Sequence, residues 1–145
     1  MDNINRLTLA DEHLLTSIPK EFGLGQVLEG RSATLLSNQS NIWIAAIENE
    51  QIIGLLIGYE IALLYKSEVL LYSIDTLEMH RRKGIGRKMV QLLCDVCSSL
   101  GIANIWIPTN ESSLAAMAFY HALGATRKAN DDVIFNLEVK SVRAP

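Results

Sequence analysis

Cysteine is scarce in this 145-residue chain, which contains only Cys94 and Cys97. A structural zinc site normally needs four ligands, and no second cysteine pair is present to complete one. The two cysteines lie within a helical pattern, in which residues three apart share a face. The sequence therefore predicts two reduced cysteines near the core and no bound metal, with redox or metal chemistry as the alternative.

The sequence also lacks a long apolar run. Its most apolar stretch begins at Ile52, continues past Glu60, and is too short and too interrupted to span a bilayer. The first residues show no basic start followed by an apolar stretch and a small-residue cleavage site, as a signal peptide would. We therefore expect a cytoplasmic protein in a reducing compartment, with no membrane partner.

An excess of positive charge is absent as well. Thirteen Lys and Arg residues stand against sixteen Asp and Glu, and the formal net charge is -3. This balance argues against nucleic acid as a partner, because phosphate binding normally needs a basic face. It is compatible with a cationic substrate. The length and the hydrophobic share of 49% predict one compact domain over residues 1–145.

Hydrophobic periodicity predicts strands that alternate with helices. A hairpin implies antiparallel neighbours, and a later strand-helix-strand unit implies a parallel pair with a right-handed crossover. The fold class expected is α/β, with a mixed, mostly antiparallel central sheet and helices on both faces. Strands are expected at 4–9, 42–47, 52–64, 69–76, 102–107 and 133–139, and helices as two short segments before residue 36, at 84–100, and from Asn110 or Ser112 to about His121.

The segment from His80 to Arg87 joins a predicted strand to the start of the longest predicted helix. Backbone N–H groups and a partial positive charge at a helix N-terminus attract anions, and glycines let a ligand approach the backbone. Three consecutive bases raise the local potential. Together these features predict a pyrophosphate site, with an unliganded basic turn as the alternative. A P-loop motif is absent, and Met89 stands where a dinucleotide fingerprint needs its third glycine.

Arg81, Gly84 and Gly86 resemble the R-x-x-G-x-G acetyl-CoA signature of the GNAT superfamily. A second element downstream, Asn110 followed by the segment Ala118–Gly124, resembles the N…A-x-x-FY-x-x-x-G pattern of the same superfamily. The resemblance covers nearly the whole chain. It implies the GNAT fold, acetyl-CoA as co-substrate, and acetyl transfer to the amine of a small molecule.

The resemblance also implies roles for individual residues. The amides of the turn hold the CoA pyrophosphate, and the backbone of the preceding strand pairs with the pantetheine arm and polarises the acetyl carbonyl. Tyr120 serves as general acid for the CoA thiolate; the alternative is a core aromatic in a stripe with Leu114 and Met117. The implied cofactor-binding residues are Ile74, Thr76, Arg81, Arg82, Lys83, Gly84, Ile85, Gly86, Arg87, Asn110 and Tyr120.

A narrower resemblance concerns the acceptor. The segments Ile42–Glu60, Glu68–Val90 and Ala118–Leu137 are similar to the GNAT-type aminoglycoside 3-N-acetyltransferases. The motifs that carry this similarity are Glu68–Tyr72, His80–Ile85 and Phe135–Glu138. This implies acetylation of an aminoglycoside at its 3-amino group, with antibiotic resistance as the consequence. The apolar last strand and family habit suggest a homodimer. Another small amine, a polyamine or a peptide N-terminus is the alternative acceptor, and a non-catalytic CoA-binding sensor is the alternative function.

The chain departs from that subgroup at the candidate base. The subgroup carries an Asp where this chain has Ser73, and the carboxylate here is Asp75. Residues two apart in a strand face the same side, so Asp75 is expected to project into the same cleft, about 6.5–7 Å further on. Asp75 is the first choice of base, against a solvent-facing or capping Asp; His80, His121 and a water chain are the other candidates.

Two further expectations complete the predicted site. Backbone N–H groups around Thr76 are expected to meet the oxyanion that develops during transfer. A polycationic acceptor would need acidic walls, because a cleft of one charge sign focuses ligands of the other. Ser73 and Asp75 are assigned to the acceptor site together with further acidic residues: Glu68, Glu111, Asp131, Asp132 and Glu138.

Overall fold

A computed structural model describes residues 3–143, which form two compact units divided between Pro108 and Thr109. The first unit holds all five strands, and the second holds two helices. No helix within residues 3–143 is long and apolar enough to cross a bilayer. The strands are β1 (Asn3–Arg6), β2 (Asn41–Glu48), β3 (Gln51–Ala62), β4 (Ser67–Thr76) and β5 (Ile105–Trp106). The α-helices are α1 (Glu12–Thr16), α2 (Arg31–Ser37), α3 (Ile85–Ser99), α4 (Leu114–Ala122) and α5 (Val139–Arg143), and the 3-10 turns are η1 (Leu9–Asp11), η2 (Lys20–Phe22) and η3 (Glu78–His80).

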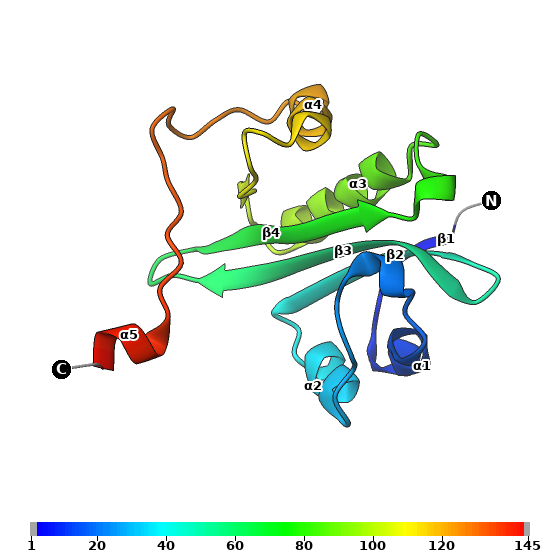
Figure 1. Cartoon of the computed structure of the whole chain (residues 1–145). Coiled ribbons are helices and arrows are strands. Elements are labelled where there is room, and N and C mark those ends of the chain that lie inside the picture. The colour runs from blue at the N-terminus through cyan, green and yellow to red at the C-terminus, as the bar shows by residue number, and fades with distance from the viewer. Residues whose placement is uncertain (1–2, 144–145) are drawn as a thin grey trace. The chain divides into compact units, whose positions relative to one another are not determined.

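The five strands form one sheet in the order β1-β2-β3-β4-β5 (Figure 1). Neighbours are antiparallel except β4 and β5, which are parallel and joined through α3. The β2–β3 hairpin turns at Asn49 and Glu50, whose φ angles of 50° and 60° suit the tight turn that matches strand twist. The predicted hairpin, the parallel pair and the mixed, mostly antiparallel sheet are thus confirmed.

Helices cover both faces of this sheet, as the alternation of apolar side chains along the strands requires (Figure 1). On one face, Ile85, Met89 and Leu93 of α3 are buried against the strands. Gly54 of β3 makes this packing close, because a Cβ there would stand 3.0 Å from Ile85 and 3.2 Å from Met89. On the α1 and α2 face, the core cluster is Leu7, Leu14, Leu15, Trp43, Ala45, Ile52, Leu55 and Ile57.

Strand β4 carries a bulge near its middle. Ile57 of β3 lies opposite Ser73, but the next residue, Gly58, lies opposite Leu71, which leaves Tyr72 as the extra residue. A bulge bends its strand and disrupts the ladder locally. On its other side β4 pairs with β5 only at Val69 and Leu70. Within residues 3–143, no strand pairs with that side of β4 from residue 71 to its end.

The last predicted strand, at 133–139, is wrong. Residues 133–138 belong to no helix or strand, and Val139 begins α5. The apolar side chains of the segment are exposed, and Phe135 is 89% exposed. Apolar and β-branched residues favour an extended backbone, but a strand also needs a hydrogen-bonded neighbour. The sequence pattern indicates an extended backbone, but it does not show whether a neighbouring strand is present.

Three predicted boundaries also need correction. The first strand ends at Arg6 instead of residue 9, and the fifth is only Ile105–Trp106 instead of 102–107. Helix α4 has Ser113 as its N-cap residue, with no side-chain cap bond, so neither Asn110 nor Ser112 caps it. Element ends depend on a few hydrogen bonds, which hydrophobic periodicity does not encode.

Candidate active site

The turn between β4 and α3 has the backbone of an anion site. Arg82 and Gly84 adopt the left-handed conformation, with φ of 64° and 81°, which turns the chain sharply into the helix. Gly84 is the N-cap of α3, and no side chain of the described residues caps it. The first amides of a helix have no intrahelical acceptor and lie at the positive end of its dipole. With Arg81, Arg82, Lys83 and Arg87 exposed around it, the turn can hold a pyrophosphate.

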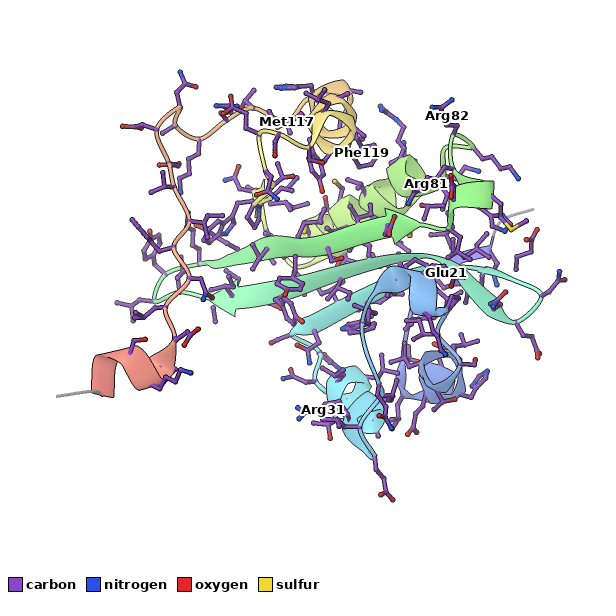
Figure 2. The ribbon with its side chains drawn as sticks, viewed as in Figure 1. Glu21, Arg31, Arg81, Arg82, Met117 and Phe119 are labelled. Atoms are coloured by element: carbon purple, nitrogen blue, oxygen red, sulfur yellow. The ribbon has the colours of Figure 1, made fainter. Side chains whose placement is uncertain are left out.

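Arg81, the first base of the predicted signature, contacts the end of β4. Its Nε donates to the Thr76 carbonyl at 2.9 Å, and its Nη2 donates to Asp75 Oδ1 at 3.2 Å. The same Asp75 oxygen accepts the Thr76 backbone N–H at 2.8 Å. Figure 2 shows Arg81 beside the end of β4, whereas Arg82 points away from the tip of the turn. The two consecutive arginines therefore occupy different environments.

On the open side of β4, two residues direct their backbone groups outward, and one of them is left to pair with a ligand. The Leu77 N–H donates to the Ile53 carbonyl of β3 at 2.8 Å, so the backbone groups of Leu77 point toward β3. Because these directions alternate along an antiparallel strand, the backbone groups of Asp75 also point toward β3. Ile74 and Thr76 then face the open side. Both Thr76 backbone groups are engaged, by Asp75 and Arg81. Ile74 is left to pair with an extended ligand, and the Thr76 N–H, an expected oxyanion donor, is bonded to Asp75 here.

Ser73 and Asp75 lie on the α1 and α2 face of the sheet. They stand opposite Ile57 and Leu55, which belong to the core cluster on that face, and directly opposed residues share a face. The Asp75 side chain is about half exposed despite its contact with Arg81. A carboxylate in this position can reach solvent and an incoming amine.

The structure separates Glu68 from Asp75. Glu68 lies at the start of β4 and Asp75 near its end, which at about 3.3 Å per residue is roughly 23 Å. Lys66 pairs with the Glu68 carboxylate at 3.1 Å. His80, a fallback base, lies 3.6 Å from the Glu48 carboxylate at the end of β2. Glu68 is therefore not gathered with Asp75.

In the second unit, Tyr120 lies on α4 with its ring 5.4 Å from that of Phe119, centroid to centroid. Burial raises the pKa of Tyr120 above its ordinary value of 10, because the phenolate is poorly solvated there. The hydroxyl therefore stays protonated at neutral pH and can act as a hydrogen-bond donor.

The remaining site residues of this unit lie close to its surface. Glu111 pairs with Arg127 at 2.8 Å, and Glu138 pairs with Lys140 at 3.5 Å. Asp131 lies in a turn and Asp132 follows it, and both are exposed. The exposed Asn110 accepts the Ser113 N–H through its carbonyl. Local cations thus partly neutralise two of the acidic residues expected to form the wall.

A hollow of about 170 Å³, not indicated by the sequence, lies between α1, α2 and β2 and is lined mainly by apolar side chains. Trp43 lines it, and its indole Nε1 is buried without a hydrogen-bond partner among the described residues. Trp43 lies opposite Ile57, which in turn lies opposite Ser73, so the hollow shares a sheet face with Ser73 and Asp75. No motif marks it, because it depends on how residues 15–35 fold against Trp43 of β2.

An aromatic pair at the bulge was likewise not predicted from the sequence. The rings of Tyr59 and Tyr72 meet edge to face, with centroids 5.8 Å apart. Tyr72, the extra residue of β4, is largely exposed and stands next to Ser73. The two tyrosines are visible in the sequence, but their contact depends on the register between β3 and β4.

Comparisons with known proteins agree with this architecture. A sequence model described as the Acetyltransferase (GNAT) family matches residues 11–125. The ribosomal protein bS18-alanine N-acetyltransferase of Escherichia coli (strain K12) is 30% identical over 71 residues, which are 49% of this chain and 48% of that protein. The chain thus spans about half the length of the curated relatives it matches first.

Solved structures share the fold at low sequence identity. An aminoglycoside acetyltransferase from an uncultured soil metagenomic sample has a TM-score of 0.80 and 23% identity, covering 96% of this chain and 99% of that one. The aminoglycoside N-acetyltransferase AAC(6')-Iy, in complex with CoA, has a TM-score of 0.79 and 14% identity, covering 96% and 95%. The family match spans most of the sequence and includes the glycine turn and α3. The chain belongs to the GNAT acetyltransferase family.

Proposed function

We propose that this protein is an N-acetyltransferase that transfers the acetyl group of acetyl-CoA to an amine. The observation that carries the proposal is a basic glycine turn at the start of α3 beside the open side of a bulged strand. An extended pantetheine arm would donate an amide N–H to the Ile74 carbonyl, and the turn would hold the pyrophosphate through its amides, with Arg82 and Lys83 beside it. The CoA complex of the structural neighbour supports this co-substrate.

In the proposed mechanism, the nitrogen of a neutral amine attacks the thioester carbonyl, and the C–S bond then breaks. Asp75, directly or through a water chain, takes the amine proton. The Ile74 N–H, which faces the open side, is a donor for the developing oxyanion. Tyr120 donates its proton to the departing CoA sulfur. The hydroxyl still carries this proton at neutral pH because burial raises the pKa of Tyr120. No residue forms a covalent intermediate.

The mechanism requires the two units to work as one GNAT domain over residues 1–145. The family match supports this, because residues 11–125 extend across the boundary between Pro108 and Thr109. A cytoplasmic location is part of the proposal, since Cys94 and Cys97 are both unbridged.

The proposed acceptor is an aminoglycoside, acetylated at its 3-amino group, with antibiotic resistance as the consequence. Structural neighbours described as aminoglycoside acetyltransferases support this class. The exposed Asp131 and Asp132 could attract a polycation. A peptide N-terminus is the second candidate, because the curated relative acts on the alanine of a ribosomal protein. The apolar hollow near Trp43 also suits an acceptor with an apolar group.

The deciding experiment is CoA release from acetyl-CoA against a panel of amines near neutral pH. The panel should contain gentamicin-like and kanamycin-like aminoglycosides, spermidine, amino acids and peptides with N-terminal alanine. We expect turnover with an aminoglycoside, and mass spectrometry of the product would identify the acetylated amine. Turnover with peptides alone would replace the aminoglycoside by the second candidate. Bound acetyl-CoA without turnover of any amine would favour a CoA-binding sensor.

We also propose that the protein forms a homodimer. Exposed apolar side chains at 133–139 support self-association, because a soluble chain rarely leaves such a run uncovered. We expect a dimer mass in light scattering, and we expect Phe135→Asp to shift it toward the monomer, because a charge replaces an apolar contact. Asn130→Asp adds the same charge nearby and should leave the mass unchanged. A monomer at all concentrations would contradict this prediction.

A further inference from the structure

We propose that Arg81 is a positioning residue whose bonds to Asp75 and Thr76 hold the phosphate-binding turn against the end of β4, and that Asp75 thereby supports acetyl-CoA binding. The inference rests on the proposed function for the identity of the ligand. It assigns Arg81 to the strand instead of the pyrophosphate, and it gives Asp75 a role separate from proton transfer.

The contacts form a closed ring of three residues. Arg81 uses Nε for the Thr76 carbonyl and Nη2 for Asp75 Oδ1, at 2.9 and 3.2 Å. Two donors of one planar guanidinium are thus committed, which fixes the plane of the group. The Thr76 N–H completes the ring by donating to the same Asp75 oxygen at 2.8 Å. We name this ring the β4 brace.

Other residues of the connection between β4 and the glycine turn also contact the sheet. The Leu77 N–H donates to the Ile53 carbonyl of β3 at 2.8 Å. His80 of η3 lies 3.6 Å from the Glu48 carboxylate at the end of β2. The connection from residue 77 to residue 81 therefore contacts three strands. The β4 brace is its contact with β4, the strand that carries Ile74.

The position of this connection matters because one ligand would span both of its ends. The pantetheine arm would pair with Ile74, while the pyrophosphate would sit on the amides that follow Gly84. A loose connection would let the distance between these two positions vary, and ordering it on binding would cost affinity. The brace sets this distance before the ligand arrives.

Electrostatics distinguishes this role from direct phosphate contact. If Arg81 served the pyrophosphate directly, the Asp75 carboxylate would only compete for it and repel an anionic ligand. Asp75→Asn would then leave acetyl-CoA binding unchanged or tighten it. If the brace is the function of the pair, the same substitution weakens binding. The two roles predict opposite signs.

The test is the dissociation constant of acetyl-CoA, measured by calorimetry without an acceptor, so that proton transfer from the amine does not contribute. Asp75→Asn keeps an oxygen acceptor but loses the ion pair, and Arg81→Lys keeps the charge but cannot make both bonds at once. Because a partly exposed ion pair contributes modestly, we expect each to weaken binding by about 1.5- to 5-fold. The double variant should be no weaker than the weaker single variant, because both remove one interaction.

Arg82→Gln is the matched control, since it removes a neighbouring charge outside the brace. Its effect on affinity should multiply with that of Asp75→Asn. The proposal would be overturned if Asp75→Asn bound acetyl-CoA as tightly as the wild type or more tightly. It would also be overturned if the effects of Asp75→Asn and Arg81→Lys on the dissociation constant multiplied in the double variant.

Hydrogen exchange of the ligand-free protein provides a readout that does not depend on acetyl-CoA. Peptides covering residues 72–84 should exchange faster in Asp75→Asn and Arg81→Lys than in the wild type, and not in Arg82→Gln. Unchanged exchange would show that no brace exists. If the wild type failed to bind acetyl-CoA, the proposed function and the affinity role would both fall, while the exchange data would still decide whether the brace exists.

Discussion

Replacing Tyr120 by phenylalanine is expected to lower kcat about 10²- to 10⁴-fold, the range typical of a lost general acid. Phenylalanine keeps the ring and its contact with Phe119 but cannot donate to the CoA sulfur. The thiolate must then leave unprotonated or wait for water. Affinity for acetyl-CoA should change little, because the hydroxyl acts on the charge that develops during transfer.

The measurement is steady-state turnover with the best amine of the panel, alongside acetyl-CoA binding. Burial raises the pKa of Tyr120 above 10, so the hydroxyl is protonated at every pH below that value. A decline of wild-type kcat caused by Tyr120 should therefore appear only above about pH 10 and be absent from Tyr120→Phe.

Tyr65→Phe makes the same chemical change at an exposed tyrosine between β3 and β4 and should leave kcat unchanged. Turnover by Tyr120→Phe at the wild-type rate would show that Tyr120 is only a packed aromatic of α4. The acid role would then pass to solvent.

Leu93→Ala is expected to lower the free energy of unfolding by about 2–5 kcal/mol, as for other buried leucines. Leu93 is 0% exposed on α3 and faces β3, where its Cδ1 lies 3.7 Å from the position that a Cβ on Gly58 would take. Close packing on the strand leaves little room for neighbours to collapse into the space left by the side chain. The loss therefore combines lost burial with a residual cavity.

Urea unfolding followed by circular dichroism would measure this change. Leu64→Ala removes the same atoms at a fully exposed position between β3 and β4 and should change stability little. Equal effects of the two substitutions would contradict the packing of α3 against β3. Because α3 starts at the turn proposed to hold the pyrophosphate, a Leu93→Ala protein that still folds should also bind acetyl-CoA more weakly.

Much of the sheet and the long helix could be predicted from the sequence because their signals are local. The β2–β3 hairpin follows from two apolar runs around a short polar turn, and both Asn49 and Glu50 adopt the positive φ that such a turn needs. The apolar positions of α3 recur with helical spacing, and Gly84 and Gly101 flank it with positive φ. The glycine turn was likewise identified from its glycines, its bases and the helix that follows it.

Other features depended on partners that no local pattern specifies. The segment 133–138 has the composition of a strand, but no neighbour pairs with it in the described residues. The bulge at Tyr72 has no sequence signal, because it is a mismatch of register between two strands. Glu68 and Asp75 lie on one strand, yet its length keeps them apart.

The sequence by itself therefore determined the fold class, the hairpin, the crossover helix and the position of the glycine turn, because each follows from side-chain periodicity or from turn residues within a few positions. The tertiary structure alone decided which backbone groups of β4 stay available, that Arg81 contacts Asp75 and Thr76, and where strands end. Each of these outcomes depends on which of several possible partners a hydrogen-bonding group takes, and those partners come together only when the chain folds.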